Sequence, residues 1–165
     1  MTVTEVNRAT PQAFTAALAG VFENSPWVPE RAAALRPFHD VEGLHAALSH
    51  EVEIAGEEEQ LALLNAHPEL GARSAMTPLS QAEQSGAGIQ SLPADRLETL
   101  REFNAEYRRR NGFPFICAVR GLSGEDILFN LETRLHHTRD EEFNEALEQV
   151  SRIAWLRLND IVESA

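Results

Sequence analysis

Residues 140–158 read DEEFNEALEQVSRIAWLRL, and this stretch decides the fold class of the chain. Its apolar residues recur every three or four positions, which places their side chains on one face of an α-helix. Those residues are Phe143, Leu147, Val150, Ile153, Ala154, Leu156 and Leu158. The pattern predicts a long amphipathic helix that starts at Asp140 and packs one face into a core.

Helix signals of the same kind fill most of the remaining chain. Thr10-Pro11 and Ser123 are typical helix starts, whereas Pro68 and Gly112 are typical helix ends. The earlier helices that we expect cover residues 10–22, 26–35, 40–52, 57–65, a short segment from 77, 93–111 and 123–135. The apolar run 113–119 fits a strand or an extended core segment, although no second strand pairs with it convincingly.

Length and composition fit one folded domain. The chain has 165 residues, of which 43% are apolar, and a chain of this size buries most of its apolar surface in a single core. It has no internal repeat, no low-complexity tract and no linker rich in Gly, Ser or Pro. We therefore expect an all-α, multi-helix bundle in which residues 1–165 form a single domain.

The charge of the chain argues against two classes of partner. It carries 14 basic and 26 acidic residues, a formal net charge of −12 at pH 7. Nucleic-acid binding needs a basic face that displaces counterions, and docking on an anionic membrane needs basic residues as well. We expect neither partner. A small anionic substrate would need a local cluster of arginines or backbone N–H groups.

The single cysteine and the N-terminal residues bear on location. Cys117 has no second cysteine to pair with, which favours a reducing compartment. Residues 1–8 are polar and lack the apolar core of a signal peptide. No run of about 18 apolar residues could span a membrane. A cytoplasmic protein is the expectation.

The histidines outside the motifs below do not predict a metal site. His136 and His137 are adjacent, so on a helix their side chains diverge by about 100°. His45 and His50 lie five residues apart, which is also a poor chelating spacing. We expect no metal ion.

The sequence His67-Pro68-Glu69-Leu70-Gly71 places a histidine just past a predicted helix end. Pro68 restricts the local dihedral angles and stops the helix, so the imidazole ring of His67 can point into a cleft. Histidine titrates near neutral pH and therefore suits general acid or base chemistry. The alternative is a structural histidine that complements the negative end of the helix dipole.

Ser80 and Glu83 lie three residues apart, in front of Gly86-Ala87-Gly88. This is the spacing of a capping box, with Ser80 as the N-cap and Glu83 as the third helical residue. Residues three apart also share a helix face. The two interpretations are compatible, because one hydroxyl and one carboxylate could point together into a pocket.

Two further features could bind a ligand. Pro114 interrupts regular structure in the run Phe113–Val119 and leaves backbone N–H groups that need an acceptor, such as a ligand carbonyl. The alternative is a buried apolar segment. Arg157 lies on the long helix, where an arginine is usually solvated or ion-paired. It could instead clamp a carboxylate through two hydrogen bonds.

Together and in this order, these motifs resemble the OHCU decarboxylase family. The resemblance is carried by His-Pro-Glu-Leu-Gly at 67–71, Ser-x-x-Glu-Gln with Ala-Gly at 80–88, Phe-Asn-x-x-Tyr at 103–107, Gly-Phe-Pro-Phe-Ile at 112–116 and Ile-Ala-x-x-Arg-Leu at 153–158. It runs over nearly the whole chain, and the first sixty residues contribute least. Two departures are Glu69, where the family often has Asp, and a shorter segment between Gly71 and Ser80, which could alter the rim of the pocket.

The resemblance implies an all-helical enzyme without cofactor or metal, often a homodimer. Its substrate would be 2-oxo-4-hydroxy-4-carboxy-5-ureidoimidazoline, and its products (S)-allantoin and carbon dioxide, in urate degradation. The resemblance further implies that His67 and Glu83 are catalytic and that Pro68, Ser80 and Arg157 bind the substrate. The backbone of Phe115, Ile116, Cys117, Ala118 and Val119 would hold the ring carbonyl.

The chemistry of this reaction fits these residue types. Loss of carbon dioxide leaves an electron pair that can enter the neighbouring C=N bond, so no cofactor is needed as an electron sink. The enzyme must orient the carboxylate, stabilise charge on the ring and deliver a proton to one face. Two alternatives stay open: a helical enzyme that acts on another ureide or heterocycle, and a non-enzymatic helical adaptor with an exposed apolar groove.

Overall fold

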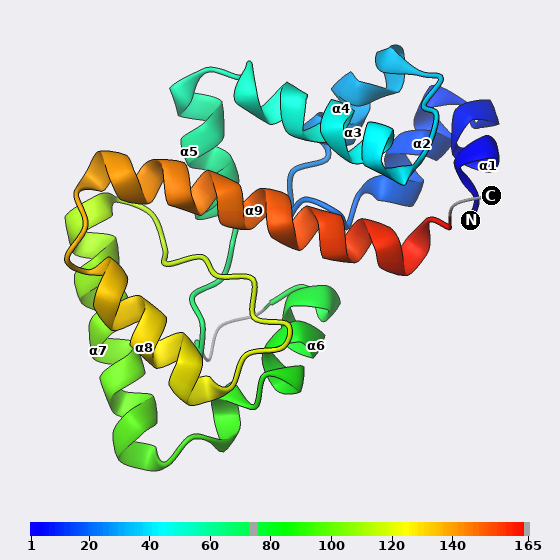
Figure 1. The fold of residues 1–165 in the computed structure, drawn as a ribbon. Helices are drawn as coiled ribbons and strands as arrows, with labels where there is room; N and C mark the ends of the chain where they lie inside the picture. The colour runs from blue at the N-terminus through cyan, green and yellow to red at the C-terminus, as the bar shows by residue number, and fades with distance from the viewer. Residues whose placement is uncertain (73–75, 164–165) are drawn as a thin grey trace. The chain divides into compact units, whose positions relative to one another are not determined.

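The computed structural model describes residues 1–72 and 76–163, and in these residues it is built from helices and loops. The elements are α1 (Val3–Arg8), α2 (Pro11–Leu18), α3 (Trp27–Ala32), η1 (Ala33–Leu35), α4 (Val41–Glu53), α5 (Glu57–Asn65), α6 (Pro78–Gly86), η2 (Ile89–Ser91), α7 (Ala94–Asn111), α8 (Gly124–Arg134) and α9 (Arg139–Ile161) (Figure 1). The described residues contain no strand beyond an isolated bridge between Thr2 and Glu163. The predicted all-α class is confirmed.

The chain divides into two compact units. The first contains Met1–Ala66 and the chain from Ser151 onward, and the second contains His67–Val150. The boundary near Ser151 falls inside α9, so this helix contributes residues to both units.

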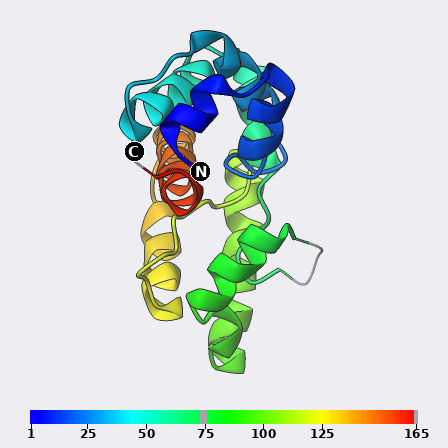
Figure 2. The same ribbon diagram turned by 90° about the vertical axis from the view of Figure 1, so that its right-hand side faces the viewer.

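In the first unit, α3 packs against both α2 and α4. Their facing sides supply buried apolar side chains, namely Phe14, Leu18, Val28, Ala32, Leu44 and Leu48. The first and last described segments of the chain lie side by side in this unit (Figure 2), because the N–H of Glu163 donates to the carbonyl of Met1 at 2.7 Å.

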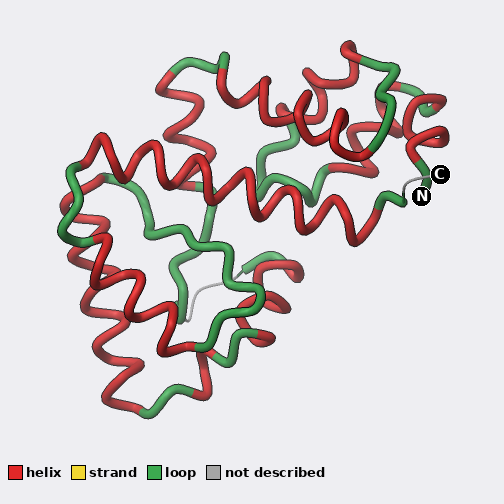
Figure 3. The backbone as a smooth tube through the Cα atoms, viewed as in Figure 1, coloured by secondary structure: helices red, strands yellow, loops and turns green. Residues whose placement is uncertain are grey.

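In the second unit, α7 and α8 pack against each other. The segment between them runs through the core as a loop (Figure 3), so the run 113–119 is an extended core segment and not a strand. Its rings Phe113 and Phe115 both meet Tyr107 edge-on, with centroids 6.0 and 5.5 Å away. Such edge-to-face pairs add to the free energy gained by burying the rings.

Local capping explains most helix starts. Asp40 accepts from the N–H of Gly43 at 2.7 Å and caps α4, and Ser123 with Asp126 forms the predicted capping box of α8. Gly112, with φ of 82°, ends α7. These boundaries match the predictions because each depends on residues within one turn of the helix end.

Other boundaries differ from the predictions. The last helix starts at Arg139 instead of Asp140, because Thr138 and Glu141 bond to each other's backbone N–H at 3.2 and 2.8 Å. The first long helix ends at Leu18, and the buried residues that follow it lie in a turn. Helix α1 was not expected, although a capping box of Thr2 and Glu5 starts it.

Candidate active site

His67 begins the second unit, directly after the end of α5, and is 7% exposed. The turn that follows it is held by two side chains from other helices. Asn104 of α7 donates from Nδ2 to the carbonyl of Leu70 at 2.7 Å. Gln84 of α6 accepts from the N–H of Gly71 at 3.0 Å. Buried side-chain bonds to backbone groups satisfy polar atoms that would otherwise destabilise the turn.

Gly71 completes this turn with a φ of 75°, in the left-handed region. A Cβ at this position would lie 3.0 Å from a methyl group of Leu100, so both the dihedral angle and the packing require glycine. Glu69 also anchors the turn, because Arg108 of α7 donates to its carboxylate at 2.8 Å. Residues 73–75, part of the segment that the sequence suggested to be short, lie outside the described residues.

Helix α6 carries the predicted hydroxyl and carboxylate. Its N-cap is Thr77, whose Oγ1 accepts from the N–H of Ser80 at 3.3 Å. The helix thus starts where the short helix from residue 77 was expected, with Pro78 in the first position, where a missing N–H does no harm. The interpretation of Ser80 and Glu83 as a capping box with Ser80 as N-cap is wrong. Ser80 is 5% exposed and Glu83 is half-buried. Their spacing places them on one side of α6, together with Gln84.

The segment 115–119 is fixed at two backbone groups. Arg134 of α8 donates from a terminal nitrogen to the carbonyl of Ile116 at 2.6 Å. Gln149 of α9 accepts from the N–H of Ala118 at 2.9 Å. The Arg134 guanidinium also lies over the ring of Phe115, 4.6 Å from its centroid, a favourable cation–π distance.

Arg134 belongs to a buried polar cluster around Glu142, which is 0% exposed. The Glu142 carboxylate accepts from Tyr107 Oη at 2.5 Å and from Arg134 Nε at 2.7 Å, and it lies 2.8 Å from His137 Nδ1. Burial, and then the bond to this carboxylate, raises the pKa of the Tyr107 hydroxyl far above its ordinary value. Tyr107 is therefore a neutral donor throughout the physiological pH range.

Sequence reasoning missed this cluster. Glu142 lies in the first turn of α9, where an acidic residue is adequately explained by the helix dipole. Arg134 lies in the last turn of α8, where a basic residue has the same explanation. A cue was present in the Phe-Asn-x-x-Tyr motif, which places the polar groups of Asn104 and Tyr107 together on the buried face of α7.

Arg157 lies in the first unit, whereas the other predicted site residues lie in the second. Its terminal nitrogen donates to the Glu23 carboxylate at 2.9 Å and to the carbonyl of Gly20 at 3.0 Å. Both charged side chains are buried. The ion-paired role considered for this arginine is thus present, with a partner 134 positions away in the sequence.

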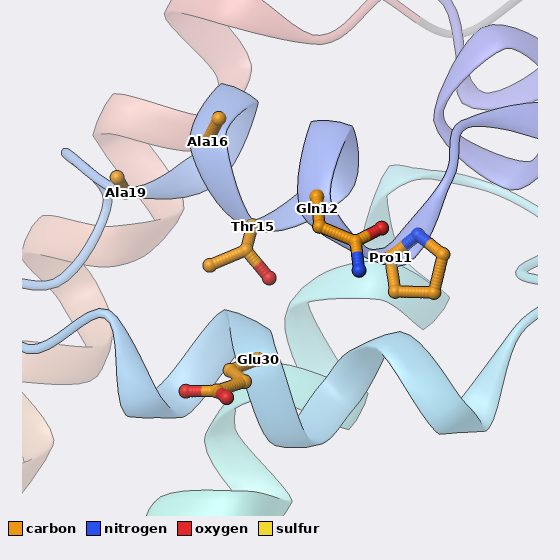
Figure 4. A pocket seen from close by; sticks show the side chains of 6 residues that line it. All are labelled: Pro11, Gln12, Thr15, Ala16, Ala19 and Glu30. Atoms are coloured by element: carbon orange, nitrogen blue, oxygen red, sulfur yellow. The ribbon is translucent and has the colours of Figure 1, made fainter.

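A hollow of about 420 Å³ lies between α2 and α3 (Figure 4). It is lined by Pro11, Gln12, Thr15, Ala16, Ala19 and Glu30. None of these residues belongs to the motifs above. One carboxylate among apolar and neutral groups does not form a catalytic set.

The described residues contain neither a metal-binding cluster nor a membrane-spanning helix. In residues 1–72 and 76–163 no group of three or more His, Cys, Asp or Glu side chains is arranged to hold a metal ion. In the same part of the chain no helix combines the length and apolar character needed to cross a membrane.

Comparisons of this chain with protein families, with individual relatives and with solved structures all point to the same family. The family model described as OHCU decarboxylase matches residues 7–159. A protein of Haloferax volcanii named 2-oxo-4-hydroxy-4-carboxy-5-ureidoimidazoline decarboxylase is 44% identical over 158 residues, which cover 96% of this chain and 94% of the relative. A protein of the same name from Halalkalicoccus jeotgali is 42% identical over 161 residues, which cover 98% and 92%. A crystal structure of (S)-allantoin synthase superposes with a TM-score of 0.79 at 32% identity, over 98% of this chain and 54% of that one.

Proposed function

This chain belongs to the OHCU decarboxylase family, and on that premise we propose that it converts 2-oxo-4-hydroxy-4-carboxy-5-ureidoimidazoline to (S)-allantoin and carbon dioxide in urate degradation. The observation that carries the proposal is the match to two relatives of that name at 44% and 42% identity over nearly their full lengths. The family match extends over residues of both compact units. This supports the further proposal that residues 1–165 work as one domain.

We assign proton transfer to His67, with Glu83 as its catalytic partner. The assignment of His67 is supported by the turn that follows it, which is anchored by Asn104 and Gln84. Catalytic side chains must be held in a fixed orientation by the structure around them. Gln84 follows Glu83 directly on α6, so the carboxylate is tied to the same turn through its neighbour. Glu83 would orient the His67 ring or contact the ureido group.

Substrate binding is assigned to Pro68, Ser80, Arg157 and the backbone of 115–119. Arg157 would clamp the substrate carboxylate, with its guanidinium oriented by the buried Glu23 carboxylate. The N–H of Ala118 is bonded to Gln149. The ring carbonyl would therefore be held by other N–H groups of this segment.

The reaction takes up one proton in total. Breaking the bond between C4 and the carboxylate releases carbon dioxide; the bonding pair forms a double bond between C4 and the carbon that bears the ureido group, and the former C=N pair moves to the ring nitrogen, which takes a proton. The carbon that bears the ureido group then takes a second proton on one face, while the 4-hydroxyl loses its proton and becomes a carbonyl. One proton is taken up for each carbon dioxide released. A histidine can move protons of this kind near neutral pH, and no step calls for a cofactor as electron sink.

Location and assembly are part of the same proposal. The resemblance to the family supports a homodimer, and the single cysteine is consistent with the cytoplasm. A sedimentation experiment on the purified protein would measure the mass of the particle against the 18.3 kDa of one chain.

A coupled assay tests the function. Urate, urate oxidase and hydroxyisourate hydrolase generate the unstable substrate in the cuvette, and circular dichroism follows the appearance of optically active allantoin. We expect rapid formation of one enantiomer with the wild-type protein and its loss in His67→Asn. If allantoin forms slowly and as a racemate with the folded wild-type protein, the proposal is wrong, and other ureides become the substrates to test.

A further inference from the structure

The segment 115–119 is held by side chains that lie outside every motif assigned to the substrate. We propose that Arg134, Glu142 and Gln149 are positioning residues, which set the orientation of this backbone toward the ring carbonyl of the substrate. The inference rests on the proposed function, because that function places the ring carbonyl on this segment.

The first contact is made by Arg134. The loop between α7 and α8 has no strand partner in the described residues (Figure 3), so side chains must define the direction of its peptide groups. Arg134 binds the carbonyl of Ile116 at 2.6 Å and covers the ring of Phe115 at 4.6 Å. Because a guanidinium is planar, these two contacts together fix the local backbone direction.

The second contact fixes Arg134 itself. Its Nε donates to Glu142 at 2.7 Å, so the arginine bridges a buried carboxylate and a backbone carbonyl. Tyr107 Oη and His137 Nδ1 lie against the same carboxylate at 2.5 and 2.8 Å. Groups from α7, α8 and the loop between α8 and α9 thus converge on Glu142 of α9. Removing Arg134 would leave this buried carboxylate without its cationic partner, which would destabilise the fold strongly.

The third contact is made by Gln149. Its Oε1 accepts from the N–H of Ala118 at 2.9 Å. Its Nε2 donates to Glu145 at 2.9 Å, which defines which end of the amide faces Ala118. The backbone between Ile116 and Ala118 is therefore held at both ends, by a donor from α8 and an acceptor from α9.

A purely stabilising role explains the cluster poorly. Replacing a buried ion pair by apolar residues of similar volume is often neutral or stabilising, so the polar groups bring little that an apolar core would not. What they do provide is a fixed set of backbone dipoles. Dipoles that are oriented before the reaction stabilise charge that develops on a substrate ring.

The test compares matched variants of the full chain in the coupled assay. Gln149→Leu removes the acceptor of the Ala118 N–H, whereas the exchange Glu145→Gln with Gln149→Glu keeps the total charge and both hydrogen bonds. Arg134→Lys keeps the charge, but an ammonium cannot bridge two sites as the guanidinium does. Ile127→Ala, which shortens a buried side chain of α8, is the control for lost stability alone.

We expect Gln149→Leu and Arg134→Lys to lower kcat/KM by roughly 10- to 100-fold, mainly through kcat, because a misplacement of about 1 Å at a reacting group has effects of that size. The optical purity of the allantoin that these two variants form should fall together with kcat/KM. The exchange variant should recover most of the activity, and Ile127→Ala should lower Tm while leaving kcat/KM and optical purity unchanged.

Two results would overturn the inference. One is a Gln149→Leu enzyme with wild-type kcat/KM and optical purity. The other is a loss of activity that the exchange variant does not recover and that Ile127→Ala reproduces. If Arg134→Lys does not fold, the inference is still tested by comparing Gln149→Leu with the exchange variant Glu145→Gln/Gln149→Glu. An inactive wild-type protein would overturn the proposed function first, and this inference with it.

Discussion

Replacing Gly71 by alanine should destabilise the protein for two separate reasons. The residue has a φ of 75°, which an L-residue adopts at a free-energy cost of about 1–2 kcal/mol. The added Cβ would also lie 3.0 Å from Leu100 Cδ2, with Leu97 at 3.4 Å. Leu100 is fully buried, so its side chain has little room to move aside.

The expected loss follows from these two effects. Overpacking a tight core typically costs about 1–3 kcal/mol, and the dihedral strain adds to it. We therefore expect Gly71→Ala to lower the free energy of unfolding by about 2–5 kcal/mol. Because the same turn follows His67, kcat should fall as well.

Gly88→Ala provides a matched control. Gly88 has a similar φ of 69°, but a Cβ there would meet nothing within 4 Å. The free energy of unfolding of Gly88→Ala should therefore fall only by the cost of the dihedral strain, about 1–2 kcal/mol. Urea unfolding followed by circular dichroism at one pH measures both variants. If Gly71→Ala costs no more than Gly88→Ala, the contact with Leu100 does not matter and the reasoning about this turn is refuted.

Three further predictions concern hydrogen bonds and charge. Tyr107→Phe removes a donor 2.5 Å from Glu142 and should lower the free energy of unfolding by about 1.5–3 kcal/mol, the range for bonds to a charged group; an unchanged urea midpoint would contradict the geometry. Thr77→Ala removes the N-cap of α6 and should lower stability by about 1 kcal/mol, measured in the same way. The pKa of Asp126 is lowered by the N–H of Ser123, so its stabilisation is complete above its unfolded pKa of 3.8 and lost as the pH falls below it. Urea unfolding at pH 7 and pH 3 should show that loss in the wild type and a smaller one in Asp126→Asn.

The helix starts were predictable where a single cap stands alone. Asp40 and Ser123 each bond to an N–H three residues later, which is information contained in one turn of sequence. The start of α6 at residue 77 was predicted too, and only the interpretation of Ser80 as an N-cap was wrong, because Thr77 offers a capping hydroxyl within the same turn. The position of Pro78 decides between them, since proline fits the first turn of a helix and Thr77 is then the residue that precedes it.

The parts of the site that could not be predicted depend on distant residues. Glu23 and Arg157 pair across 134 positions, and Gln149 reaches the Ala118 backbone across 31. Nothing near either residue in the sequence indicates such a partner. A buried carboxylate such as Glu142 also looks like an ordinary residue of a helix start until the packing of three helices is known.

The bond between the N–H of Glu163 and the carbonyl of Met1 brings these two residues together within the first unit. A short peptide linker is therefore enough to join residue 163 to residue 1, and the chain can then be opened elsewhere in a circularly permuted form. Gly56 is a suitable new opening, since it is exposed between α4 and α5 and a Cβ there would meet no neighbour within 4 Å. A circularly permuted protein of this kind would carry its affinity tag or fluorophore at Gly56, away from residues 1 and 163.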